Sequence, residues 1–386
     1  MFDKVKQLSI NGFGLNQKEY IQEEWVDMPE YDNVKNPEPE ITATFKFRNE
    51  NDYNEFKTLV QKHVYKGKRV FDGNQQIQKK HAWFPRLEKP SDYIYVNSEY
   101  HKPAFPIYIV SKGRYNRNPT SRALKEMQVD FYMIIEEQEF DQYSKLVDSK
   151  QLLVLPKKFQ DEYDTFWEVK DGKTGVGAAR NYAWQHSLDN GFDWHWVMDD
   201  NIECFERMNK NIKVKCTDGS IFCACEDFVN RYENIGQAGL QYANFMPYSD
   251  DRPPFKLNTR IYSCLLQNNH VKQRWRGRYN EDTDLSIRIM KDGWVTIQFN
   301  AFLQAKRATQ TLKGGNTDEF YKDEGTLPKS QMLADMHPDI CKVVERFNRD
   351  HHYVDYSVFQ NKLIKKKDLN IKNRINNYGM ELKKIK

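Results

Sequence analysis

The chain has 386 residues, of which 39% are hydrophobic and 30% are charged, and its formal net charge is +4. This length allows one large domain and a smaller one, and the composition excludes an intrinsically disordered chain. No stretch approaches the roughly 18 apolar residues of a membrane-spanning helix, and the N-terminus lacks the apolar core of a signal peptide, so we expect a soluble, cytoplasmic protein.

The N-terminal quarter of the sequence predicts a small appendage rather than a full domain. Residues 1–40 form a polar arm with prolines and acidic residues near its end. Residues 41–100 predict a small α+β module and a linker, with strands at 41–47 and 79–85 around a helix at 49–64. About 50 residues are too few to bury a sizeable core of their own.

Residues 104–325 predict an α/β domain. Short apolar runs that read as strands cover residues 106–115, 130–140, 151–156 and 193–201. Helical patterns between them cover residues 121–128, 141–150 and 175–191. Alternating βα units of this length favour a mainly parallel sheet with flanking helices, and ligands of such sheets bind outside the carboxyl ends of the strands.

The fourth of these strands ends on three polar residues: Asp199, Asp200 and Asn201. Such residues are common at turns because their side chains bond the local backbone. In a parallel sheet, however, they lie at the same edge as the basic glycine loop 111–117 and the strand end at Glu136 and Glu137. This edge therefore predicts a site rather than an ordinary turn.

The helix at 175–191 begins with the sequence GVGAARN. Gly175 and Gly177 allow a ligand to approach the backbone N–H groups, and Arg180 adds a forked cation suited to phosphate. A lone pair of glycines with this spacing serves packing more often than binding, and the binding interpretation gains weight here because the helix directly precedes the acidic strand end.

A second acidic cluster opens another predicted helix, EDTDLSIRIMKDGW, with Glu281, Asp282 and Asp284 in its first turn. These acids favour the positive end of a helix dipole without any catalytic role. Two separate carboxylate clusters are also what metal-dependent group transfer needs. One cluster holds a divalent cation that neutralises a departing diphosphate, and the other supplies a general base.

In order and spacing, the motifs GVGAARN, VMDDN and EDTDLSIRIMKDGW resemble nucleotide-sugar glycosyltransferases of the GT-A (Rossmann-like) fold. The resemblance implies that Asp199, Asp200 and Asn201 stand at the Asp-x-Asp motif, binding Mn²⁺ or Mg²⁺ and the sugar diphosphate. It makes Asp282 the acceptor base, with Glu281 and Asp284 beside it. Asn201 replaces the usual last Asp and is a weaker, neutral ligand, so either the metal affinity is lower or Asp200 takes the role of that Asp.

Residues 104–310 further resemble bacteriophage enzymes that glycosylate 5-hydroxymethylpyrimidines in DNA. This resemblance implies a UDP-sugar donor carrying a hexose, or a pentose such as arabinose, and 5-hydroxymethylcytosine or hydroxymethyluracil in phage DNA as acceptor. The setting would be the cytoplasm of an infected bacterial host. The implied donor-binding residues are Ser111, Arg114, Arg117, Glu136, Glu137, Gly175, Gly177, Arg180, Asn181, Asp199, Asp200 and Lys313, the last in a glycine loop that is either a lid or an exposed connector.

Basic and aromatic residues alternate just before the predicted base, in KQRWRGRYNED. This pattern suits DNA phosphates and an unstacked base, or equally the donor diphosphate. The candidate acceptor-binding residues are Lys272, Arg274, Trp275, Arg276 and Arg278. Residues 326–386 predict a helical, basic C-terminal extension. Its last 26 residues carry nine Lys or Arg against two acids, either as a solvated surface or as a phosphate contact.

Six scattered cysteines suit a reducing compartment. Cys216, Cys223 and Cys225 lack paired zinc-knuckle spacing, and the TDG sequence between them predicts a hairpin. His337, His351 and His352 are metal candidates only in principle. Three alternatives stay open: a glycosyltransferase acting on protein or polysaccharide, a metal-dependent nucleotidyltransferase, and a noncatalytic DNA-binding protein. The oligomeric state and the stereochemical outcome of transfer are not specified by the sequence.

Overall fold

The computed structural model describes residues 17–32, 41, 45–62, 64–65, 68–69, 92–97, 100–168, 175–246, 252–306, 327–346 and 349–385. Lys313 and the strand expected at 79–85 lie outside these residues. The helix expected at 49–64 is confirmed as α2 (Glu50–Lys62), and Asn49 accepts a hydrogen bond from the Asp52 N–H at 2.9 Å. Residues 45–47, the described end of the other expected strand, are not extended into a sheet.

A sheet of ten strands forms the centre of the described structure, in the order β6-β5-β4-β7-β12-β10-β13-β8-β9, with β11 paired to β13. The strands are β4 (Ile107–Val110), β5 (Tyr132–Ile135), β6 (Leu152–Val154), β7 (Trp194–Asp199), β8 (Ile202–Asn209), β9 (Ile212–Lys215), β10 (Ile235–Tyr242), β11 (Phe255–Leu257), β12 (Cys264–Asn268) and β13 (Val295–Lys306). Seven of them, β4, β5, β6, β7, β9, β10 and β13, run in one direction. The predicted mainly parallel α/β fold is confirmed.

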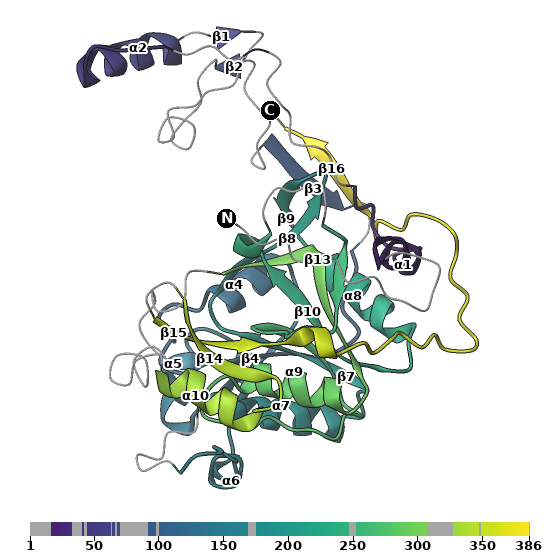
Figure 1. Cartoon of the computed structure of the whole chain (residues 1–386). Helices are drawn as coiled ribbons and strands as arrows, with labels where there is room; N and C mark the ends of the chain where they lie inside the picture. The colour runs from purple at the N-terminus through teal and green to yellow at the C-terminus, as the bar shows by residue number, and fades with distance from the viewer. Residues whose placement is uncertain are drawn as a thin grey trace.

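Helices cover both faces of this sheet (Figure 1). They are α4 (Pro119–Glu126), α5 (Phe140–Tyr143), α6 (Lys157–Asp161), α7 (Gly177–Asp189), α8 (Ser220–Asn230) and α9 (Glu281–Lys291). Strand β4 shows why both faces must be covered, because all of its side chains are buried and they alternate between two cores. Ile107 and Ile109 pack in the core that includes α4 and α8, whereas Tyr108 and Val110 pack against α7 and α9.

Two local predictions are wrong. The helix expected at 141–150 is only the short α5, because Asp148 accepts a hydrogen bond from the Lys150 N–H at 3.0 Å and starts a separate 3₁₀ turn, Ser149–Gln151. The hairpin expected around Asp218 is also wrong. The Asp218 carboxylate instead accepts a bond from the Ser220 N–H at 3.0 Å, where helix α8 begins.

The two ends of the chain differ from expectation. In the predicted polar arm, α1 (Gln17–Glu24) leads to Trp25, which is buried against Phe228 and Phe255 at ring distances of 5.8 and 5.9 Å. The helical C-terminal extension is wrong beyond α10 (Leu327–Met336).

After α10, the chain forms an antiparallel hairpin of β14 (Cys341–Arg346) and β15 (Arg349–Val354). The last strand, β16 (Met380–Lys384), pairs with β3 (Tyr93–Asn97). Before β16, residues 362–374, the lysine-rich segment, form no helix, and their backbone bonds to the main body, as where the Lys366 N–H donates to the Arg231 carbonyl at 2.9 Å. None of the described helices combines the length and apolar character that crossing a membrane requires.

Away from the main body, Figure 1 draws α2 beside a two-stranded pair, β1 (Val64–Tyr65) with β2 (Lys68–Arg69). The domain boundaries that the sequence suggests stay a prediction.

Candidate active site

A pocket of about 620 Å³ opens at the carboxyl edge of the central sheet. Residues at the ends of β4, β7 and β13 line it, together with the start of β12, the first turn of α9, and parts of α10 and the β14–β15 hairpin. Its volume is in the range of pockets that bind cofactor-sized ligands. The edge predicted from strand order therefore holds a pocket in the described structure.

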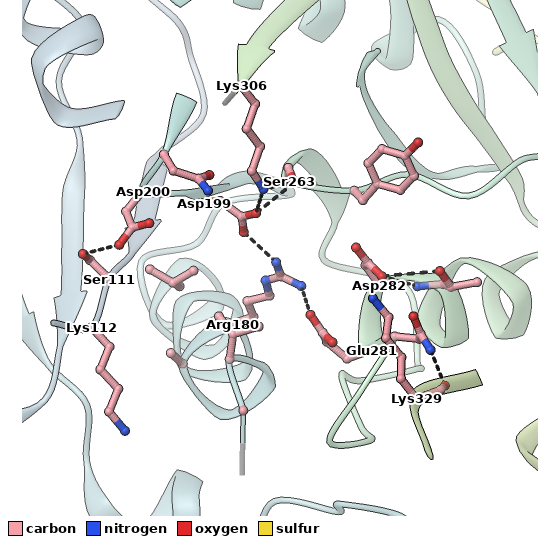
Figure 2. Close-up of a pocket in the computed structure, with 18 of the residues that line it drawn as sticks. Ser111, Lys112, Arg180, Asp199, Asp200, Ser263, Glu281, Asp282, Lys306 and Lys329 are labelled. Atoms are coloured by element: carbon pink, nitrogen blue, oxygen red, sulfur yellow. Dashed lines mark hydrogen bonds and ion pairs between the residues drawn. The ribbon is translucent and has the colours of Figure 1, made fainter. Parts of the chain in front are cut away.

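Asp199, the last residue of β7, is held by three side chains in this pocket (Figure 2). Its Oδ1 accepts a bond from Arg180 at 2.8 Å, and its Oδ2 accepts bonds from Ser263 Oγ at 2.8 Å and Lys306 Nζ at 2.7 Å. The topology brings them together, because β7 and β13 end at this edge and the antiparallel β12 begins there. Burial alone would raise the pKa of Asp199, but Lys306 and Arg180 hold that pKa well below its usual range.

Asp200 faces the opposite part of the pocket, toward β4. It accepts a hydrogen bond from Ser111 Oγ at 2.7 Å and forms an ion pair with Arg114. Burial raises the pKa of Asp200 although Arg114 opposes the shift. Asn201 also lines the pocket, and its Oδ1 is buried without a hydrogen-bond partner among the described residues.

Arg180 joins the two acidic clusters. Its side chain is only 3% exposed, and it donates to Asp199 at 2.8 Å and to Glu281 at 2.9 Å. Its guanidinium also lies 4.6 Å from the ring centre of Trp275, which fixes its orientation. Burial raises the pKa of Glu281 to about 7, with Arg180 opposing the shift, so this carboxyl is less acidic than an exposed one.

Asp282 is the pocket carboxylate with the least compensation. Its Oδ1 accepts a bond from the Thr283 N–H at 2.7 Å, and no salt bridge reaches it from any cation in the described parts of the chain. It is half-buried and faces the pocket from the first turn of α9. A carboxylate in this state can accept a proton from a bound hydroxyl group.

Asp284 is placed differently from the two acids before it. It is fully buried and does not line the pocket. Arg276, Arg288 and His337 bind it at 3.1, 2.6 and 2.9 Å. Burial opposes ionisation, but these three partners lower the pKa of Asp284 to about 2. Asp284 therefore braces the helix that carries Asp282, and the structure does not bring it to the reaction site.

The predicted donor-binding residues divide into two groups. Ser111, Arg114, Glu136, Gly175, Arg180, Asp199 and Asp200 all line the pocket. The structure does not bring Arg117, Glu137, Gly177 or Asn181 there.

Gly177 and Asn181 have packing roles instead. A Cβ at Gly177 would lie 1.8 Å from the hydroxyl of Tyr163, so the glycine makes room for that ring. Asn181 holds the backbone of Trp275 through two 2.9 Å hydrogen bonds.

None of the five predicted acceptor-binding residues lines the pocket. Arg274 lies over the ring of Trp184 at 4.3 Å, Arg276 binds Asp284, and Trp275 is buried beneath Arg180. The alternation of basic and aromatic residues in this segment therefore reflects packing between helices α7 and α9.

Sequence reasoning missed the cations that do line the pocket: Lys112, Arg260, Lys306, Lys329, Arg346 and Arg349. Lys306 ends a strand that points to the same edge as Asp199, so the strand-end rule would have found it once β13 was recognised. His351 and His352, which the sequence offered as metal candidates only in principle, also line the pocket.

The divalent cation implied by the GT-A resemblance does not fit this arrangement. Both oxygens of Asp199 and both of Asp200 already accept bonds, and a dication at Asp199 Oδ2 would meet the Lys306 ammonium. Within the motif of residues 199–201 this leaves Asn201 Oδ1, one neutral amide oxygen, where such an ion prefers several charged or neutral oxygens. Among the residues that the structure describes, no three His, Cys, Asp or Glu side chains are grouped to hold a metal ion.

A family model described as TET-associated glycosyltransferase matches residues 105–315, which is more than half of the chain. The matched range runs from just before β4 to beyond β13, and it contains Asp199, Asp282 and Lys306. Helix α10 and the β14–β15 hairpin lie outside it. A search among curated proteins finds no match.

Proposed function

Because the chain belongs to the TET-associated glycosyltransferase family, it is a glycosyltransferase, and we propose that it transfers a sugar from a UDP-sugar to a hydroxymethyl group on a pyrimidine of phage DNA. The acceptor is 5-hydroxymethylcytosine or 5-hydroxymethyluracil, and the sugar is a hexose or a pentose such as arabinose. This activity gives a role to both sides of the pocket, with the donor beside Ser111 and Lys112 and the acceptor beside Asp282 and Lys329.

The observation that carries the proposal is the pairing of a cation-bound acidic cluster with a separate carboxylate, Asp282, that forms no salt bridge among the described residues. Arg180 and Lys306 offer charge to a donor diphosphate, and Asp282 lies on the far side of Arg180 and Glu281 (Figure 2). In the proposed reaction, Asp282 takes the proton of the hydroxymethyl group. The hydroxymethyl oxygen attacks the anomeric carbon of the sugar. The bond between that carbon and the diphosphate breaks, and UDP leaves.

The donor nucleotide occupies the side of the pocket lined by Ser111 and Lys112, opposite Lys329 and Asp282 (Figure 2). Arg180 and Lys306 then supply the positive charge that the sequence resemblance assigned to Mn²⁺ or Mg²⁺. Both side chains are at least 89% buried, and charge at such a site acts more strongly on a leaving group than charge in water does.

The acceptor base cannot reach Asp282 while it is stacked in a duplex. We therefore include extrusion of the hydroxymethylated nucleotide, which enzymes acting on bases commonly require. A single-stranded acceptor avoids that step and is expected to react at least as well when sequence is matched.

The test is to incubate the protein with a panel of UDP-sugars and with DNA containing cytosine, 5-hydroxymethylcytosine or 5-hydroxymethyluracil, with EDTA in one arm and Mn²⁺ in another. Mass spectrometry of the digested nucleosides should show a sugar-sized gain only on a hydroxymethylated base. UDP release with no gain on DNA would shift the acceptor to protein or polysaccharide. Pyrophosphate release from nucleoside triphosphates would instead identify a nucleotidyltransferase.

A further inference from the structure

We propose that one face of the β14–β15 hairpin docks the phosphate backbone of the acceptor DNA next to Asp282. This inference rests on the proposed function for the identity of the acceptor. The hairpin lies outside the range that matches the family model, so the family does not assign it a role.

The register of the hairpin separates its charges. Directly opposed residues of an antiparallel pair share a face, and successive pairs alternate between faces. The pairs Lys342–Tyr353, Val344–His351 and Arg346–Arg349 therefore lie on one face, which we call the cationic face. The pair Glu345–Asp350 lies on the other. Three cations and no acid occupy the first face, and both acids of the paired residues occupy the second.

The cationic face borders the pocket. Arg346, Arg349 and His351 line it, together with Lys329 of α10. In the parts of the chain that the structure describes, no carboxylate forms a salt bridge with Arg346 or Arg349. Both arginines are exposed, so they are accessible to a polyanion.

An exposed aromatic ring accompanies these cations. The Arg346 guanidinium and the Lys342 ammonium lie 5.4 and 5.7 Å from the ring centre of Tyr353. Rings flanked by cations are a common way of holding a nucleic-acid strand, because the cations bind phosphates while the ring stacks on a base.

The hairpin is held rigidly to the helix that carries the proposed base. Its Cys341 and Val354 share a buried cluster with Ile287 and Met290 of α9. His337, between α10 and β14, binds the buried Asp284 of α9 at 2.9 Å. DNA docked on the cationic face would thus be held at a fixed position relative to Asp282, as an acceptor extruded toward that carboxylate requires.

The cationic face suits the acceptor better than the donor. The donor diphosphate already has Arg180 and Lys306, and Figure 2 places Lys329 at the Asp282 side, away from Ser111 and Lys112. Cations on the far side of Asp282 would contact the acceptor DNA, which carries the hydroxyl group. The phosphates supply the dominant charge of DNA.

The test compares double variants by fluorescence anisotropy with a labelled, unmodified DNA duplex over a range of salt concentrations. Arg346→Gln/Arg349→Gln removes two charges from the cationic face. Losing two phosphate contacts should weaken binding by roughly 30-fold at about 0.15 M salt and reduce the salt slope by about 2. The KM for hydroxymethylated DNA should rise with it, and kcat should change much less.

Two controls locate the effect. Glu345→Gln/Asp350→Gln alters the opposite face of the same hairpin and should not weaken DNA binding. Lys366→Gln/Lys367→Gln removes the same charge as the arginine variant from the exposed lysine-rich segment, and it should change the affinity less than threefold. An unchanged Kd in the arginine variant would overturn the proposal, and a loss confined to the Lys366/Lys367 variant would move docking to that segment.

Failure of this inference differs from failure of the proposed function. If the natural protein glycosylates DNA and the arginine variant has the same Kd and KM, docking is wrong and the function stands. If the natural protein modifies no DNA, and the arginine variant binds DNA with the same Kd as the natural protein, both the docking proposal and the proposed function fail. A Kd that rises in the arginine variant although the natural protein transfers no sugar would leave a DNA-docking surface without the proposed reaction.

Discussion

Lys306→Met gives the sharpest test of how the leaving group is stabilised. The substitution keeps an unbranched side chain but removes the ammonium that donates to Asp199 Oδ2 at 2.7 Å and to Ser263 Oγ at 2.9 Å. The Lys306 side chain is 11% exposed and its ammonium lies 5.7 Å from the ring centre of Tyr242, so methionine keeps apolar and aromatic contacts there. Asp199 retains its bonds from Arg180 and Ser263. We therefore expect the variant to fold.

The expected loss of rate follows from the position of that charge. Two unit charges about 4 Å apart interact by about 4 kcal/mol at an effective dielectric constant of about 20. Removing one preorganised group that stabilises developing negative charge commonly costs about 10²- to 10³-fold in kcat. A departing UDP gains charge as the glycosidic bond breaks, so we expect Lys306→Met to lower kcat by about 10²- to 10³-fold. UDP affinity should fall less.

The assay is the initial rate of UDP release at saturating DNA, measured with EDTA and with Mn²⁺ for the natural protein, Lys306→Met and Lys306→Arg. The natural protein should stay active in EDTA, and Lys306→Arg should retain more activity than Lys306→Met because it keeps the charge. Two results would refute the reasoning: full activity of Lys306→Met, or a natural protein that EDTA inactivates and Mn²⁺ restores.

Three further substitutions separate the roles of neighbouring residues. Asp282→Asn should lower transfer at least about 10³-fold while UDP affinity stays within twofold by calorimetry, because it removes a base and no donor contact; near-normal turnover would exclude Asp282 as base. Lys272→Gln should leave DNA affinity within twofold in the anisotropy assay, since Lys272 does not line the pocket; a large loss would restore the basic segment as an acceptor site. Asp284→Asn should destabilise folding by about 3 to 5 kcal/mol in urea titrations at neutral pH, because it leaves buried cations without their anion. Because the pKa of Asp284 is lowered, ionised Asp284 stabilises the folded protein above pH 3.8, and this stabilisation is lost as the pH falls through about 2. The free energy of unfolding of the variant should therefore lack this fall between pH 3.8 and about 2. A variant with the same stability and the same pH dependence as the natural protein would show that Asp284 is not a brace.

The sequence predicted the first half of the sheet well because its strands are short apolar runs separated by turns. β4, β5, β6 and β7 all fall within the expected segments. The second half was not predicted, because its strands carry buried amides. Gln237 of β10 donates to Gln267 of β12 at 3.0 Å, and Gln304 of β13 donates to the Leu240 carbonyl at 2.9 Å. A search for apolar periodicity reads such strands as polar loops.

Some residues of the candidate site could also be predicted from the sequence and others could not. Asp199 and Asp282 could be predicted because each follows a local rule, a strand end in one case and a helix start in the other. Arg346 and Arg349 could not, because only the packing of α10 and the hairpin against α9 brings them to the pocket. The prediction that Asp284 lies in the reaction site is wrong, because the local pattern does not show which way its side chain points. Its position in the first turn of α9 matches that of Asp282, but the helix turns its side chain inward to Arg288 and His337.

Asn201 and Lys306 act in the same electrostatic direction, because both favour binding of a diphosphate without a metal ion. A dication is held by one or two carboxylates together with the phosphates of its ligand, and here the carboxylates of Asp199 and Asp200 are already bound by cations while residue 201 offers only a neutral amide. A single ammonium needs only one carboxylate partner, and Lys306 has it in Asp199. The neutral amide of Asn201 and the ammonium of Lys306 both make the local potential that a diphosphate meets more positive than a carboxylate at position 201 and an uncharged side chain at position 306 would. Restoring a metal site should therefore require both changes together, and an Asn201→Asp/Lys306→Met variant should gain Mn²⁺-dependent UDP binding that neither single variant shows.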